Sequence, residues 1–88
     1  MKKAIITVVG KDTVGIIAKI CVFLAENKVN ILDISQTIVD GYFNMMMVAD
    51  VTNVEFDKVV TDLKTVGEGI GVIIRCQRED IFDKMHRI

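Results

Sequence analysis

The feature that most constrains the fold is the order in which two hydrophobic periodicities follow one another along the 88 residues. Apolar residues recur at helical spacing over 14–28 and again after residue 52, whereas runs of strand length occupy 3–9, 30–40, 42–51 and 72–77. The order is therefore β-α-β-β-α-β, which is typical of the ferredoxin-like plan. We expect an α+β domain with a four-stranded antiparallel sheet and two helices on one face.

The strands differ in the composition of their two faces. The run 3–9 is almost entirely apolar, which predicts a central strand covered on both faces. The run 42–51 is apolar on both faces, so we expect something to cover its outer face. Asp40-Gly41 predicts a type I′ hairpin, because this turn needs φ > 0 at both positions. The run 30–40 alternates, which predicts one buried and one wetter face. Its apolar members are Leu32, Ile34 and Ile38.

The two helices each carry an apolar stripe, and sequence signals suggest where the second one begins and ends. Thr52-x-x-Glu55 is a capping-box pattern that opens it, and a series of glycines ends it. The glycines are Gly67, Gly69 and Gly71. The first stripe consists of Ile16, Ile17, Ile20, Cys21 and Leu24. The second consists of Phe56, Val59, Val60, Leu63 and Val66. Both stripes predict helices that pack against the sheet.

The apolar content is high for a domain of this size. Hydrophobic residues make up 51% of the chain, and so small a domain buries only about 60–65% of its unfolded surface. We therefore expect a homo-oligomer, in which the sheet face without helices packs on another copy.

We divide the chain into a domain over 1–78 and a helical tail over 79–88. The tail is too short to be helical alone, so it must dock on its own domain or across a dimer interface.

Several classes of protein are excluded by composition and spacing. No apolar run approaches the ~20 residues that span a membrane. The net charge is −1 and there is no basic stripe, so we expect no nucleic-acid partner. Cys21 and Cys76 have no metal-ligand spacing, and two free thiols in a reducing cytoplasm are the expected state. We expect no metal and no cofactor.

Catalysis finds little support in the sequence. Gly10 and Gly15 have the spacing of a P-loop, but Ile16 and Ile17 stand where the lysine and the hydroxyl residue should follow, so nucleotide hydrolysis is rejected. The single histidine, His86, lies near the end of the chain. No acid–base partner is visible for the carboxylates of the first half. We therefore expect a protein that is not an enzyme.

The segment 10–18 is the best candidate for a ligand site. It joins a strand to a helix, whose first N–H groups would point at a bound anion. Asp12 lies where it would meet a cation, so the pair would suit a free amino acid. The alternative is a tight strand-to-helix turn in which Gly10 and Gly15 serve close packing. Asn30 also has two interpretations. It would serve the backbone, by capping the helix or beginning the strand. Alternatively, its side chain would bond a polar ligand.

These residues resemble the ACT domain family. The specific part is Gly10-Lys11-Asp12-Thr13-Val14-Gly15-Ile16, followed about fifteen residues later by Asn30-Ile31. The nearest likeness is to the ACT modules of the glycine cleavage system transcriptional repressor and of formyltetrahydrofolate deformylase, and to short stand-alone ACT proteins. Many relatives carry Arg-Pro where this chain has Thr13-Val14. The departure removes a cationic side chain and a rigid turn residue.

The resemblance implies a homodimer that binds an amino acid or similar small effector at the subunit interface. The implied ligand-binding residues are Gly10, Asp12, Gly15 and Ile16 from the loop, and Asn30 and Ile31 from the neighbouring subunit. Without a catalytic or DNA-binding domain, the chain would regulate a metabolic enzyme or a regulator in trans. The alternative function is a ligand-free interaction module that docks on such a partner.

Overall fold

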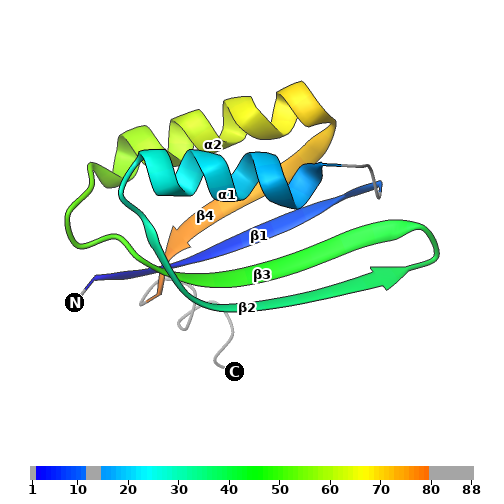
Figure 1. Ribbon diagram of the computed structural model, residues 1–88, viewed down its shortest axis with the longest axis horizontal. Helices are drawn as coiled ribbons and strands as arrows, with labels where there is room; N and C mark the ends of the chain where they lie inside the picture. Colours follow the sequence, from blue (N-terminus) through cyan, green and yellow to red (C-terminus); the bar gives the residue numbers. More distant parts are fainter. Residues whose placement is uncertain (1, 12–14, 80–88) are drawn as a thin grey trace.

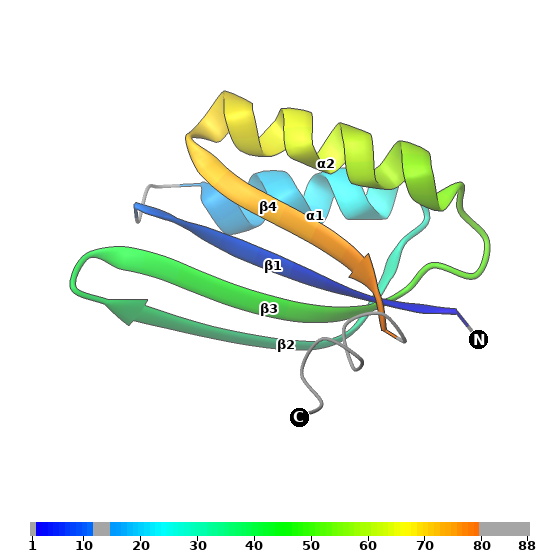
Figure 2. The ribbon, with the colours of Figure 1, turned by 180° about the vertical axis from the view of Figure 1, so that it is seen from behind.

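The computed structural model describes residues 2–11 and 15–79, and it has the predicted order of elements. The elements are β1 (Lys3–Lys11), α1 (Ile16–Glu26), β2 (Asn30–Val39), β3 (Tyr42–Asp50), α2 (Phe56–Ile70) and β4 (Val72–Arg78). Both helices lie on one face of the sheet, as the two opposite views show (Figures 1 and 2). The ferredoxin-like prediction is confirmed.

The sheet has the strand order β2-β3-β1-β4, and every neighbouring pair is antiparallel. β1 is therefore central, as predicted. The helix side of the strand is buried at Ala4, Ile6 and Val8, whereas on the other side Ile5 is buried and Val9 is exposed. The expectation that β1 is covered on both faces therefore holds in the single chain at Ile5 but not at Val9.

The hydrophobic core lies between the sheet and the two helices. Alternate residues of the central strands point into it, in keeping with the period of two. The core consists of Ala4, Ile6, Val8, Ile16, Ile20, Leu24, Val29, Phe43, Met45, Met47, Ala49, Val51, Val59, Leu63, Val72, Ile74 and Cys76. The methionines of β3 follow this alternation, since Met45 and Met47 face the core while Met46 faces outward.

The turn between β2 and β3 has the predicted backbone. Asp40 has φ 52° and Gly41 has φ 79°, as a type I′ turn requires. Val39 and Tyr42 pair directly across it. The tight turn fixes the register of the hairpin, so that Phe43, Met45 and Met47 all point toward the helices.

The capping-box prediction is wrong. α2 begins at Phe56, and its N-cap, Glu55, makes no side-chain capping bond. The Thr52 hydroxyl donates to Asp50 Oδ1 at 2.5 Å, its backbone N–H donates to the same oxygen at 2.9 Å, and its hydroxyl accepts from the Lys2 backbone N–H. These bonds from Thr52 lower the pKa of the Asp50 carboxyl. The Thr52 hydroxyl therefore belongs to a local turn with Asp50 and does not cap α2.

The predicted helix ends also need correction. α2 continues through Gly67 and Gly69 to Ile70, and only Gly71, with φ 75°, caps it. α1 ends at Glu26, where the Asn27 side-chain amide donates to the Phe23 carbonyl at 2.8 Å. Lys28 takes the left-handed conformation, with φ 61°. Asn30 is thus the first residue of β2 and not a helix cap.

The predicted buried face of β2 is wrong for the single chain. β2 is an edge strand, while α2 packs on β4 at the opposite edge. A register irregularity falls between Ile31 and Asp33. Ile34 and Ile38 do lie on the helix side, opposite Met47 and Phe43, but both are exposed because the helix layer leaves this edge uncovered.

Two further expectations concern the thiols and membranes. Cys21 and Cys76 are both free, the first half-buried and the second buried. Among the described residues, neither helix is long and apolar enough to cross a bilayer.

Of the predicted helical tail, residues 80–88 lie outside the described part of the chain, so the division at 78/79 stays a prediction.

Candidate functional site

The predicted glycine loop is shorter than the sequence suggested. β1 runs on to Lys11, so Gly10 is a strand residue that pairs with Phe43 on one side and Val72 on the other. A Cβ at position 10 would lie 2.6 Å from Val72 Cγ1 and 3.0 Å from Val72 Cα. Gly10 therefore allows the close approach of β1 and β4. This favours the architectural reading for this glycine.

Gly15 serves a different purpose. It is the N-cap of α1 with φ 88°, a conformation that favours glycine, and among the described residues outside its chain neighbours no atom lies within 4 Å of where its Cβ would be. Its carbonyl accepts from the Lys19 N–H at 3.0 Å. The space beside the helix start is thus open, and glycine is required here by the backbone and not by packing.

The start of α1 presents hydrogen-bond donors that the helix itself does not satisfy. The first N–H groups of a helix have no partner within it. Here the N-cap, Gly15, has no side chain to cap them, and the first turn, all of it described, has no acidic residue. Ile16 contributes only its backbone, because its side chain is buried in the core. The positive end of the helix dipole and these donors suit a carboxylate or another anion. Asp12, the expected cation partner, lies outside the described residues.

The two halves of the predicted site lie at opposite ends of the sheet. Gly10 aligns across β3 with Ile38, whereas Ile31 aligns through Ala49 with Ala4. Six residues of strand separate these positions along β3, or about 20 Å. Figure 1 shows the end of β1 and the start of α1 at one end of the sheet and the start of β2 at the other. A single chain brings Gly10, Gly15 and Ile16 together but not Asn30 and Ile31.

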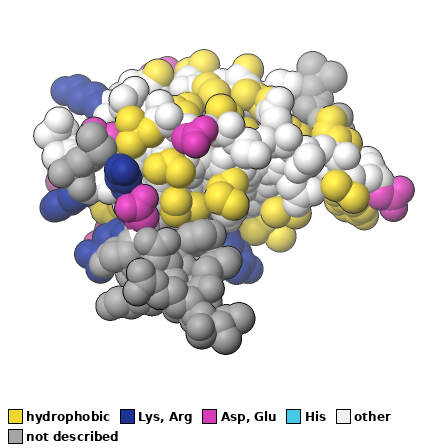
Figure 3. Space-filling view, turned by 90° about the horizontal axis from the view of Figure 1, so that it is seen from below, with side chains coloured by type: hydrophobic (Ala, Val, Ile, Leu, Met, Phe, Trp, Pro, Cys, Tyr) yellow, Lys and Arg dark blue, Asp and Glu magenta, His cyan; other side chains and the backbone are white. Residues whose placement is uncertain are grey.

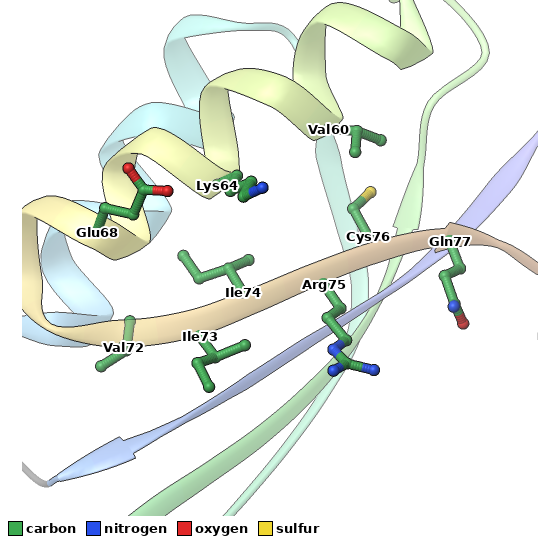
Figure 4. A pocket seen from close by; sticks show the side chains of 9 residues that line it. All are labelled: Val60, Lys64, Glu68, Val72, Ile73, Ile74, Arg75, Cys76 and Gln77. Atoms are coloured by element: carbon green, nitrogen blue, oxygen red, sulfur yellow. The ribbon is translucent and has the colours of Figure 1, made fainter.

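The structure also has a groove that the sequence did not reveal. It has a volume of about 500 Å³ and lies between α2 and the edge strand β4. Val60, Lys64 and Glu68 of α2 form one wall, and β4 forms the other, with Arg75 pointing away from the helix (Figure 4). The helical spacing of the three α2 residues was visible, but only the tertiary structure places them beside a free strand edge.

The described residues hold no group of three or more metal-ligating side chains. Burial raises the pKa of the Cys76 thiol to about 11, which makes this thiol a poor nucleophile. The donors at the start of α1 are the feature with the clearest ligand preference.

Known proteins resemble this chain over nearly its whole length. The ACT domain family profile matches residues 2–77. A UPF0237 protein of Bifidobacterium longum is 63% identical over 90 residues, with 100% of both chains covered. An ACT domain protein from Streptococcus pneumoniae is 43% identical with a TM-score of 0.83, covering 92% of this chain and 93% of that one.

A more distant likeness is confined to the fold. A formyltetrahydrofolate deformylase from Pseudomonas syringae is 22% identical with a TM-score of 0.81, and the match covers 89% of this chain but 28% of that one. The deformylase thus carries a domain of this fold within a longer protein. Because the profile and the relatives match almost every described residue, the chain belongs to the ACT domain family.

Proposed function

We propose that this protein is a regulatory module that binds a small effector, an amino acid, at an interface between two identical copies. The observation that carries the proposal is the start of α1, where the N-cap, Gly15, has no side chain and the first N–H groups have no partner within the helix. These donors would hold the carboxylate. Asp12 would take the ammonium group, which makes the site selective for a zwitterion over a simple anion.

The second half of the site would come from the partner copy. Because Asn30 lies at the far end of the sheet from Gly15, the strands of the two copies must run in opposite directions for Asn30 of the partner to reach the loop. Its amide would bond the polar part of the effector beside Ile31. Two equivalent sites then form in each dimer, one at each end.

We place the protein in the cytoplasm, with a regulatory and not a catalytic role. A longer relative such as the deformylase carries its ACT-like domain in the same chain as the rest of the enzyme. We propose that this protein acts in trans on a metabolic enzyme or a regulator. An effector that favours the dimer would change partner binding, and the partner would change effector affinity by the same factor.

The test is a thermal-shift panel of the common amino acids on the purified protein. A ligand at one hundred times its dissociation constant adds about 2.7 kcal/mol of stability, which raises Tm visibly in a domain of this size. We expect one or a few amino acids to raise Tm. Asp12→Ala and Asn30→Ala should abolish the shift, while Asn53→Ala, an exposed asparagine on another loop, should retain it.

A panel without any response would contradict the effector proposal. The exposed apolar residues of the free sheet face would then favour the second candidate, a ligand-free module that docks on an enzyme or regulator. A shift that survives in Asn30→Ala but not in Asp12→Ala would leave a site within one copy. The three results are therefore distinguishable in one experiment.

A further inference from the structure

The strand β4 forms one edge of the described sheet, so it has a strand neighbour on one side only. Its seven residues pair with β1 from Val72 to Arg78 without a register shift. On the other side of an edge strand, N–H and C=O groups point outward in a row. A second strand is the partner that bonds such a row along its whole length. The chemistry of the β4 edge therefore favours an extended backbone.

The opposite edge of the sheet is less suited to strand addition. β2 carries a register irregularity between Ile31 and Asp33, and irregularities of this kind interrupt pairing and protect edge strands. The two edges also differ in their cover, since α2 packs on β4 whereas Ile34 and Ile38 of β2 are exposed on the helix side. An added strand would find a continuous ladder and a helix beside it only at β4.

The groove of about 500 Å³ between α2 and β4 lies along this edge. Figure 4 shows Val60 at the end of the groove where Cys76 lies, and Glu68 at the end where Val72 lies, with Lys64 between them. Every second side chain of an added strand would enter the groove beneath α2. The half-buried Val60 makes the Cys76 end of the groove the place for an apolar side chain.

The remaining side chains of an added strand would lie beside Ile73 and Arg75. Both residues belong to the sheet face opposite the helices, because Ile73 pairs directly with the exposed Val9. Hydrophobic side chains gather on this face (Figure 3). Ile73 is 63% exposed, so an apolar side chain directly opposite it would form a stabilising cross-strand pair.

The charges along the groove select the partner. The lining has two basic side chains, Lys64 and Arg75, and one acidic side chain, Glu68, although the whole chain has a net charge of −1. Opposite charges directly across a strand pair stabilise it, and like charges destabilise it. Since Arg75 is the middle residue of β4, antiparallel pairing of two β4 strands about their centres would set two Arg75 side chains opposite each other. An acidic strand fits this edge better than a second copy does.

We infer that the β4 edge binds an extended segment of another protein, which adds a fifth strand to the sheet beside α2. The segment carries an acidic residue opposite Arg75 and apolar residues opposite Ile73 and Cys76. In the antiparallel direction, which every strand pair of this sheet has, its sequence reads apolar-acidic-any-apolar. Main-chain hydrogen bonds supply the affinity and alternate side chains supply the specificity. The inference goes beyond the proposed function, and it stands without an effector.

The test titrates the isotope-labelled full chain with the synthetic peptide Thr-Val-Glu-Thr-Val-Thr, blocked at both ends, and follows the backbone amide signals by NMR. In the inferred register the glutamate lies opposite Arg75. We expect the signals of residues 72–78 to shift and those of residues 30–39 to stay in place. Of two peptides N-methylated at alternate positions, the one that loses the amides facing β4 should not bind, and the other should bind.

A charge exchange tests the specificity. The peptide with lysine in place of glutamate should bind the wild type about two- to fivefold more weakly. Arg75→Glu changes an exposed side chain, and it should reverse this preference, which a loss of folding cannot do. Lys19→Glu makes the same change of charge at an exposed position of α1, and it should retain the preference for glutamate.

Several results would overturn the inference. The wild type may not bind without shifts at 72–78, so an absence of shifts there, or shifts at 30–39 in their place, excludes the β4 edge. Equal affinity for the glutamate and lysine peptides, or equal binding of both N-methylated peptides, excludes the inferred register of side chains and backbone. A change of the mass in solution caused by Arg75→Glu, measured by sedimentation, would assign this edge to a second copy. Because no amino acid enters these titrations, their outcome is independent of the effector panel.

Discussion

Cys21 and Cys76 show how burial sets the chemistry of a single residue. Cys76 belongs to the core between β4 and the helices, and desolvation raises its pKa to about 11. Cys21, on α1, is half-buried. The sequence placed Cys21 on a helix stripe and Cys76 in a run of strand length, and only the packing shows how deeply each thiol is buried. Gly10 and Gly15 differ in the same way, since one serves close packing and the other a left-handed backbone.

We expect the two thiols to react at different rates with an aromatic disulfide reagent. Near pH 8, Cys21 should react first, and Cys76 should react only as fast as the domain opens, because its thiolate is scarce and buried. Mass spectrometry of the modified peptides identifies the site. The Cys21→Ala variant should then show no fast phase, and a fast phase in that variant would contradict the buried state of Cys76.

The pKa of Cys76 also predicts how stability depends on pH. The unfolded thiol has a pKa of about 8.5, whereas the folded one has a pKa of about 11. Between these values the unfolded state binds fewer protons than the native state, so the free energy of unfolding falls as pH rises. Urea unfolding from pH 8 to 10.5 should show this decline. The decline should be smaller in Cys76→Ala, where other groups still titrate, and an equal decline would refute this cause.

At the scale of elements, the contact between α2 and β4 controls the ends of both. Gly67 lies inside α2, and a Cβ there would be 2.8 Å from the Val72 carbonyl oxygen and 3.0 Å from Ile74 Cγ1. Gly69, one half-turn on, has no atom within 4 Å of its Cβ position. The glycine series looked like a helix terminator because glycine weakens helices, but at Gly67 the close approach of a strand explains it.

The two glycines should therefore respond oppositely to alanine. Gly69→Ala should stabilise the domain by about 0.5–1 kcal/mol, the ordinary gain in a helix. Gly67→Ala should destabilise it by about 1–3 kcal/mol, because the added methyl group meets the backbone of β4. Urea unfolding of both variants measures the difference. Stabilisation by both substitutions would show that α2 shifts easily away from β4.

At the scale of the whole molecule, the fold leaves apolar surface on two sides of the sheet. The helices cover one face of the sheet as far as the β2 edge (Figure 2). No described element covers the opposite face, where Val9 and Met46 are exposed. An 88-residue domain has little stability to spare for such exposure. Association with another copy would remove that surface from water and would stabilise each protomer.

If the folded state is a dimer, its stability must depend on protein concentration. Each tenfold increase should add about 1.4 kcal/mol per dimer to the free energy of unfolding. The Tm measured from about 1 to 100 µM should rise steadily for the wild type. It should stay constant for Met46→Glu, which would put a charge on the exposed sheet face opposite the helices. A wild-type Tm independent of concentration over this range would contradict an obligate dimer.

The sequence by itself determined the order of elements, the hairpin turn and the family. These features depend on local periodicity and on residues such as Asp40 and Gly41 whose backbone preferences act over a few positions. The start of α2 and the end of α1 could not be read in this way. Thr52 bonds Asp50 in place of a helix, and Asn27 with Lys28 ends α1 before Asn30. In each case two local patterns competed for the same residues, and local hydrogen bonds decided between them.

The tertiary structure decided what the glycine motif and Asn30 can do. It made Gly10 part of the sheet, left open space at Gly15, and put Asn30 about 20 Å away along the strands. It also exposed Ile34 and Ile38, which the alternating pattern had predicted to be buried. The physical reason is that periodicity reports which face of a strand is apolar, whereas only the arrangement of layers determines whether anything covers that face.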